Sequence, residues 1–293
     1  MYQRRTDLAL EARELRRGQA QDLDGVTSCE RKTHGFSVTA VAVETEAAAR
    51  ELGKPVGTYV TLDLRSGRAD GEDVLQRAAR AVGEELRSLL GGAVRSALVV
   101  GLGNAAMTPD AVGPQTAEHV LVTRHLLGER SLASLTPVSV LTPGVLGRTG
   151  IEAAETIRGA VQTVRPDVVV AVDALASRSL ARVCATVQLS DSGIVPGSGV
   201  GNHRRSLTRD TLGVPVVAVG VPTVVDAATL ALDVLEEAGA QSVDPAALRG
   251  HDGVMVTPRD IDAQIRELSR IVGYGIDLAL QPLEYDALCA LMA

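Results

Sequence analysis

The sequence predicts an α/β fold with a mainly parallel sheet and helices on both faces, plus additional smaller elements. Short runs rich in valine and leucine alternate along the chain with segments whose apolar residues recur every three to four positions. The runs lack polar alternation, which is typical of parallel strands buried on both faces. We find no internal repeat and no Ser/Gly linker, so residues 1–293 are expected to form a single α/β domain.

The composition narrows the class of protein. The chain has 293 residues and a formal net charge of −7, which disfavours nucleic acid as a direct partner. One phenylalanine and no tryptophan leave little for a base-stacking platform. The three cysteines form no C-x-x-C pair, so a reducing, cytoplasmic compartment is expected. No apolar run approaches the roughly 18 residues of a membrane helix, and the N-terminus has no signal-peptide pattern, so no membrane partner is expected.

In the first third of the chain the patterns predict helices and strands in turn. A charged segment over 8–17 is expected to form a short helix. Residues 35–43, with low polarity on either face, and the half-buried pattern of 59–64 predict two strands. Apolar residues at three-to-four spacing then predict an amphipathic helix over 75–90, which ends at Gly91.

The rest of the chain alternates strands with helices, which implies a parallel sheet. Strands are expected over 97–101, 138–141, 167–173, 185–189 and 215–220, and helices over 114–127, 151–164 and 226–238. Asp226 is well placed as the N-cap of the last of these helices. The segment 257–260, Thr-Pro-Arg-Asp, resembles a capping box with proline at the first helical position and predicts a further helix behind it.

Two acidic residues follow two of the predicted strands. Asp110 lies in the loop just past the strand over 97–101, and Asp173 closes the strand over 167–173. If both strands are parallel members of one sheet, both carboxylates project at its carboxyl edge. In open α/β sheets this edge is where ligands and catalytic groups collect.

A close pair of carboxylates suggests a specific chemistry. Both cannot ionise cheaply, so one keeps its proton. The ionised one can take a proton from water while the protonated one polarises a carbonyl, an arrangement that hydrolyses amides. Alternatively, both acids hold a divalent metal ion that activates the water. The same positions also suit structural roles, with Asp110 as a helix N-cap and Asp173 as a solvated strand end.

A glycine-rich segment over 196–203 is the second candidate site. It lacks the Gly-Lys-Ser/Thr ending that a Walker phosphate loop requires. Its backbone N–H groups are still able to bind a substrate carbonyl or an oxyanion, which makes Ser198, Gly199 and Asn202 candidate substrate-binding residues. A long flexible loop is the alternative. A non-catalytic α/β module that binds phosphate or a nucleotide is a further alternative for the whole chain.

Five stretches of the chain together resemble one family. They are 5–12 (RTDLALEA), Gly103-Asn104 followed by 108–114 (TPDAVGP), 173–178 (DALASR), 196–202 (PGSGVGN) and 220–226 (GVPTVVD). On these motifs the chain is similar, nearly from end to end, to the germination proteases of endospore-forming bacteria. Those enzymes degrade the small acid-soluble spore proteins that coat spore DNA.

The resemblance implies a fold similar to that of hydrogenase maturation proteases, with the two essential aspartates of the family at Asp110 and Asp173. It also implies small acid-soluble spore proteins as substrates, a homotetramer, and a location in the cytoplasm of the forespore or spore core. The family has been classed with both metalloproteases and aspartic-type proteases. We favour a carboxylate pair that needs no cofactor. A divalent metal, as in a metal-dependent maturation-type protease, is the alternative.

The resemblance further implies a zymogen that removes its own N-terminus at a site like the substrate site. Substrates of the family carry Thr-Glu-(Phe or Ile)-Ala-Ser-Glu and are cut after the first Glu. Residues 6–11, Thr-Asp-Leu-Ala-Leu-Glu, have the same pattern, so self-cleavage is expected between Asp7 and Leu8, with 1–7 as a propeptide shorter than is usual in the family. An acid before the cut suggests a basic group in the cleft, with Arg178, Arg204 and Arg205 as candidates.

Overall fold

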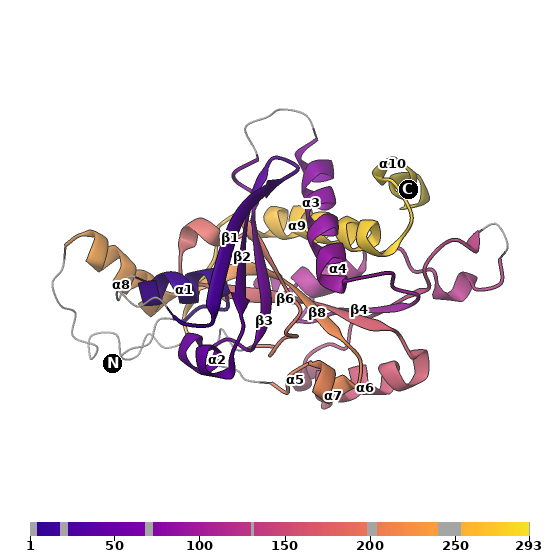
Figure 1. Ribbon diagram of the computed structural model, residues 1–293, viewed down its shortest axis with the longest axis horizontal. Helices are drawn as coiled ribbons and strands as arrows, with labels where there is room; N and C mark the ends of the chain where they lie inside the picture. Colours follow the sequence, from indigo (N-terminus) through magenta and orange to yellow (C-terminus); the bar gives the residue numbers. More distant parts are fainter. Residues whose placement is uncertain are drawn as a thin grey trace.

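A computed structural model describes residues 5–17, 23–67, 73–129, 132–197, 204–239 and 253–292. Within them, one nine-stranded mixed sheet runs in the order β1-β2-β3-β7-β8-β6-β4-β5, with β9 paired to β8 (Figure 1). The strands are β1 (Val26–Thr33), β2 (Phe36–Val43), β3 (Gly57–Asp63), β4 (Ala97–Gly101), β5 (Val138–Leu141), β6 (Val168–Ser177), β7 (Thr186–Ser190), β8 (Val216–Asp226) and β9 (Met255–Val256).

The sheet has a parallel half and an antiparallel half. Strands β5, β4, β6 and β8 pair in parallel, as expected. The prediction of a mainly parallel sheet is wrong for β1, β2, β3, β7 and β9, which pair antiparallel. The reason is local at β1 and β2, since only His34 and Gly35, both with positive φ, connect them in a tight hairpin that forces antiparallel pairing.

Helices cover both faces of the sheet, as the sequence predicts. They are α1 (Ala9–Arg17), α2 (Glu46–Leu52), α3 (Val74–Leu90), α4 (Val112–Ala117), α5 (Leu146–Thr149), α6 (Ala153–Val164), α7 (Arg209–Leu212), α8 (Ala227–Glu237), α9 (Ile261–Leu280) and α10 (Tyr285–Met292). Along β6, alternate residues enter two different cores, one with α3, α4 and α9 and the other with α6 and α7. In Figure 1, α3 and α9 accordingly lie above the sheet and α6 and α7 below it.

Two expected helix boundaries are wrong. The helix predicted over 114–127 ends at Ala117, because the chain beyond it bonds to other elements instead. The N–H of Leu121 donates to Asp277 of α9, and the Thr123 hydroxyl both accepts from Val138 N and donates to Thr136 O. The predicted capping box over 257–260 also fails, because α9 begins only at Ile261 and the hydroxyl of Thr257 donates instead to Thr223 O of β8 at 2.8 Å.

The length difference between β4 and β6 shapes the candidate site. β4 ends opposite Val172 of β6, with Gly101 and Val172 as the last pair. β6 continues to Ser177 alongside β8, which is also longer than expected. Beyond Val172, β6 therefore has a free edge on the side that β4 has left.

Candidate active site

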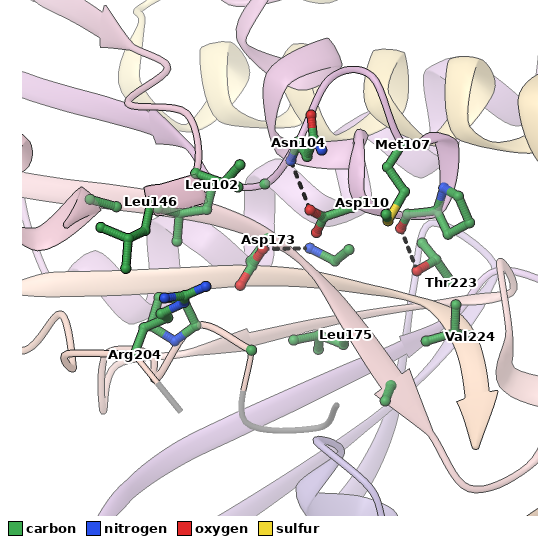
Figure 2. Close-up of a pocket in the computed structure, with 18 of the residues that line it drawn as sticks. Leu102, Asn104, Met107, Asp110, Leu146, Asp173, Leu175, Arg204, Thr223 and Val224 are labelled. Carbon is green, nitrogen blue, oxygen red and sulfur yellow. Dashed lines mark hydrogen bonds between the residues drawn. The ribbon is translucent and has the colours of Figure 1, made fainter. Parts of the chain in front are cut away.

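A cavity of about 500 Å³ lies at the carboxyl ends of β4, β6 and β8 (Figure 2). Three aspartates line it, Asp7, Asp110 and Asp173, and they come from the N-terminal segment, the loop after β4 and the strand β6. Apolar side chains make up much of the remaining wall, among them Leu102, Met107, Leu146, Leu175, Val224 and Met255. The structure thus brings both predicted catalytic acids to one hollow at the predicted sheet edge.

Asp173 is the deeper of the two predicted acids. It follows the buried valines of β6 and is itself only 5 % exposed. Its Oδ1 accepts a hydrogen bond from the N–H of Ala174 at 3.0 Å. Burial, and then the negative charges of Asp110 and Asp7, raise the pKa of Asp173 well above its ordinary value. This carboxyl is therefore harder to ionise than an ordinary aspartate, and a solvated strand end is the wrong interpretation, because the side chain is buried.

Asp110 is half-buried in a short 3₁₀ turn, Thr108–Asp110. Its Oδ2 accepts a hydrogen bond from the N–H of Asn104 at 2.8 Å. Burial raises the pKa of Asp110, and the bond from Asn104 opposes that rise. A role as helix N-cap is wrong, because α4 is preceded by Ala111 and has no side-chain cap.

Two glycines let the loop fold back over the strand ends. Gly103 has φ +112°, and a Cβ there would lie 2.1 Å from the carbonyl oxygen of Asp110. A Cβ at Gly113 would lie 2.2 Å from the carbonyl oxygen of Leu102, so only glycine fits this close approach of α4 to β4. The hydroxyl of Thr223 on β8 also holds the loop, because it donates a hydrogen bond to Pro109 O at 2.7 Å. These contacts fix Asp110 relative to β6 and β8.

The N-terminal segment is docked on the free edge of β6. The N–H of Asp7 donates to Ala176 O at 2.8 Å, and Ala176 N donates to Asp7 Oδ2 at 2.8 Å. The following residues Leu8 and Ala9 are completely buried, at the start of α1. Asp7, the residue before the predicted cut, therefore lies in the cavity wall that Asp110 and Asp173 also line.

Lys54, in the loop before β3, and Gln188, on β7, also hold the N-terminal segment. Lys54 Nζ donates to the carbonyl oxygens of Thr6 at 3.1 Å and Asp7 at 2.9 Å. Gln188 Nε2 donates to Asp7 O at 3.2 Å, while its Oε1 accepts from Ala9 N at 2.8 Å. Burial lowers the pKa of Lys54, and the nearby carboxylates of Asp7 and Glu11 oppose this shift. Sequence reasoning missed both residues.

Glu11 anchors α1 four residues after Asp7. Its side chain is completely buried. It accepts hydrogen bonds from the backbone N–H of Arg178 at 2.6 Å and of Ser179 at 3.1 Å, and from Arg182 Nη1 at 3.1 Å. The Thr6 hydroxyl also donates to it. A buried carboxylate with four donors is well satisfied, so this contact fixes the position of the segment.

The predicted basic residues have other partners. The Arg178 guanidinium pairs with Asp233 at 2.9 Å, and the backbone N–H of this arginine donates to Glu11 of the docked segment. Arg204 and Arg205 line the cavity, where they pair with Glu152 at 3.8 Å and Glu155 at 3.3 Å. The other predicted substrate-binding residues, Ser198, Gly199 and Asn202, lie outside the described residues.

A local sequence signal existed for only one of the residues that sequence reasoning missed. Lys54 is one of two lysines in the chain, next to Pro55, in a protein that otherwise uses arginine as its cation. Gln188 and Arg182 stand in ordinary strand and turn contexts, and only the fold brings them to Asp7 and Glu11.

Two further properties of the described chain concern metals and membranes. Among the described residues, no three His, Cys, Asp or Glu side chains are grouped so that they could hold a metal ion. The acids of the cavity thus form no ligand set of that size in this part of the chain. Within the same ranges, every helix is too short or too polar to cross a membrane.

The sequence comparisons with known proteins agree on one family. A family model described as germination protease matches residues 4–238. The germination protease of Clostridium perfringens is 41 % identical, over 96 % of this chain and 96 % of its own length. That of Caldanaerobacter subterraneus subsp. tengcongensis is 41 % identical over 95 % and 94 %, and that of Bacillus cereus is 44 % identical over 80 % and 66 %. Among solved structures, the [NiFe] hydrogenase maturation protease HycI from Thermococcus kodakarensis aligns over 66 % of this chain and 98 % of its own, with 18 % identity and a TM-score of 0.38.

Proposed function

Because this chain belongs to the germination protease family and is therefore a peptidase, we propose that it starts the degradation of small acid-soluble spore proteins when spores germinate. It is made as a zymogen and cuts itself between Asp7 and Leu8, so that residues 1–7 are a propeptide. One observation carries this proposal. The segment with the Asp7–Leu8 bond lies in the wall of the cavity that Asp110 and Asp173 line.

The two acids divide the proton chemistry between them. Asp173 is the more deeply buried, and its pKa is raised both by burial and by the charge of Asp110, so it holds the proton of the pair. Asp110 is the ionised partner and takes a proton from the attacking water. Asp173 gives its proton to the substrate peptide. The pair thus supplies both a general base and a general acid.

The docked segment has the features of a substrate. Its acid before the cut, Asp7, bonds to the edge of β6, and its second acid, Glu11, lies in a nest of donors four residues later. This spacing equals that of the two Glu residues in the family's substrates. A segment held in this way also occupies the cleft, which supports a zymogen that is inactive toward other chains until the cut is made.

The first test is the cleavage of a synthetic peptide that contains Thr-Glu-Phe-Ala-Ser-Glu, followed by mass spectrometry. A single cut after the first Glu is expected with a chain that begins at Leu8, and Asp110→Asn and Asp173→Asn are expected to abolish it. The full chain is expected to lose 1–7 on its own, and both variants should remain intact. Cleavage by the Asp173→Asn chain, or an active chain that still begins at Met1, would contradict the proposal.

We propose that the water is activated by the carboxylate pair without a metal ion. Support comes from the unequal surroundings of the two acids, since Asp173 is the more deeply buried and its pKa is raised by burial and by the charge of Asp110, as in a pair in which one carboxyl keeps its proton. Exhaustive chelation is expected to leave the full peptide-cleaving activity. If one specific divalent metal restores an activity that chelation removed, the alternative of a metal-dependent maturation-type protease takes its place.

The assembly and location follow from the family and remain proposals for this chain. We propose a homotetramer in the cytoplasm of the forespore and spore core. Size-exclusion chromatography with light scattering is expected to give four times the mass of one 30.5 kDa chain. A stable monomer with full peptide-cleaving activity would overturn the assembly without affecting the proposed chemistry.

A further inference from the structure

The peptide bond after Asp7 is held by side chains that the acid pair does not supply. Its carbonyl oxygen accepts hydrogen bonds from both Lys54 Nζ, at 2.9 Å, and Gln188 Nε2, at 3.2 Å. The other end of the Gln188 amide accepts from Ala9 N at 2.8 Å, so one side chain clamps both sides of the Asp7–Leu8 bond. Because Ala9 N can only donate, this clamp also orients the amide with its NH₂ group toward Asp7.

The N–H of the same peptide is fixed as well. Leu8 N donates to Thr6 Oγ1 at 3.0 Å. Asp7 itself is bonded on its other side, through its own N–H and its carboxylate, to Ala176 of β6. Asp7 is therefore held between the edge of β6, in the parallel half of the sheet, and the two donors Lys54 and Gln188.

We propose that Lys54 and Gln188 are the oxyanion-binding pair of the self-cleavage reaction between Asp7 and Leu8. This inference rests on the proposed function and deepens it. Two donors already at hydrogen-bond distance from a carbonyl oxygen are placed to stabilise the negative charge that develops on it, at no further reorganisation cost. Lys54 is partly buried, which strengthens the effect, because a partly desolvated N–H donor interacts more strongly with a developing charge.

The reaction balances in protons when Asp110 and Asp173 transfer them and Lys54 and Gln188 bind the oxyanion. Asp110 takes one proton from water, and the resulting hydroxide forms a C–O bond to the carbonyl carbon of Asp7. The electron pair of the C=O bond moves to the oxygen held by Lys54 and Gln188. When the tetrahedral intermediate collapses, the C–N bond breaks and Leu8 N takes the proton of Asp173. The acid pair ends with one proton, as it began, now on Asp110.

The test follows the loss of residues 1–7 from the purified full chain by intact mass spectrometry over time. Lys54→Met removes the donor and keeps the length of the side chain. Gln188→Glu keeps the acceptor for Ala9 N and removes the donor to Asp7 O. Each is expected to slow self-cleavage about 10²–10³-fold, the usual loss for one oxyanion donor. Lys54→Arg, which keeps a donor, is expected to recover part of the rate, and Lys32→Met, the exposed lysine of β1, to leave it unchanged.

A purely anchoring role for the two side chains predicts a different result. In a background of Asp173→Asn, which blocks the cut, hydrogen exchange of the backbone over 5–9 reports how firmly the segment is docked. Slower cleavage by Lys54→Met with unchanged protection supports the inference. Protection lost in proportion to the rate, or a wild-type rate in both donor variants, overturns it. Self-cleavage by Asp173→Asn alone would instead overturn the proposed function.

Discussion

Asp173 on β6 and Asp277 on α9 are both buried acids whose pKa is raised mainly by burial, yet their surroundings differ. Asp277 is packed inside the fold, and both of its oxygens accept from one backbone N–H, that of Leu121, at 3.0 Å. Asp173 faces a cavity and has two other carboxylates, Asp110 and Asp7, near it. A raised pKa alone therefore does not identify a catalytic acid. The cavity and the neighbouring acids are what distinguish Asp173 as the candidate.

The largest expected effect is a loss of peptide-cleaving activity in the Asp173 variant that the Asp277 variant does not share. Asp173→Asn is expected to reduce peptide cleavage by about 10³-fold or more, because it removes the proton that the pair transfers. Asp277→Asn is expected to stay within about threefold of the wild-type rate, since its amide oxygen can still accept from Leu121. Steady-state rates of a chain that begins at Leu8 decide this. Equal losses in both variants would mean that Asp173 acts through the fold alone.

The sequence identified this acid pair because its signals are local. A valine-rich run ends at Asp173 and another ends shortly before Asp110, and two parallel strands bring their ends to one edge of a sheet. The parallel half, the helices on both faces and the N-cap at Asp226, whose side chain accepts from Thr229 N, follow from patterns of the same kind.

The rest of the site could not be predicted in this way. Gln188 and Asp7 are 181 positions apart, and Arg182 and Glu11 are 171 apart. No periodicity within a strand or helix encodes such contacts, which appear only when β7 and β6 are placed beside the docked segment. The antiparallel half was missed for a related reason, because strand direction depends on connections such as the two-residue turn at His34 and Gly35.

Glu11 is a third buried acid, and its role is tested by the free energy of unfolding instead of by activity. Glu11 is surrounded by donors rather than by acids, so its loss leaves two buried backbone N–H groups, those of Arg178 and Ser179, without this acceptor. Arg182 loses one of its two acidic partners and keeps Glu14. Glu11→Ala is expected to lower the free energy of unfolding by about 3 kcal/mol. Glu14→Ala is the control, one turn further along α1 with the same Arg182 as partner, and is expected to cost less than about 1 kcal/mol because Glu14 is exposed.

Urea denaturation of the Asp173→Asn background measures both values, since no self-cleavage then interferes. Both variants remove one partner of Arg182, but Glu11→Ala also removes the acceptor of two backbone N–H groups and of the Thr6 hydroxyl. Equal costs for Glu11→Ala and Glu14→Ala would show that the donors around Glu11 are solvated in solution. The hydrogen bonds to Glu11 would then no longer explain how the N-terminal segment is held.

The smallest expected effect concerns the pH dependence of stability. Here the replacement of a buried acid is expected to raise stability, whereas Glu11→Ala lowers it. For Asp173 and Asp277 the folded pKa is raised above the value of 3.8 that the unfolded chain is expected to have. The folded chain then binds protons that the unfolded chain releases, so each acid lowers stability as pH rises from about 4 through its folded pKa. Asparagine carries no such proton. Each Asp→Asn variant is therefore expected to melt at a higher temperature than the parent chain at neutral pH, and the advantage disappears near pH 4.

The shape of that difference distinguishes the two acids. For Asp277, whose pKa is raised to about 8 by burial, the advantage of Asp277→Asn grows up to about pH 8 and is constant above it. For Asp173 the advantage depends on a second acid, so Asp110→Asn is expected to reduce it by removing the neighbouring charge. Thermal melts of the single and double variants between about pH 4 and pH 9 measure this coupling. Strict additivity of Asp110→Asn and Asp173→Asn would mean that the two carboxyls do not share a proton, and the cavity would then hold two independent acids instead of a catalytic pair.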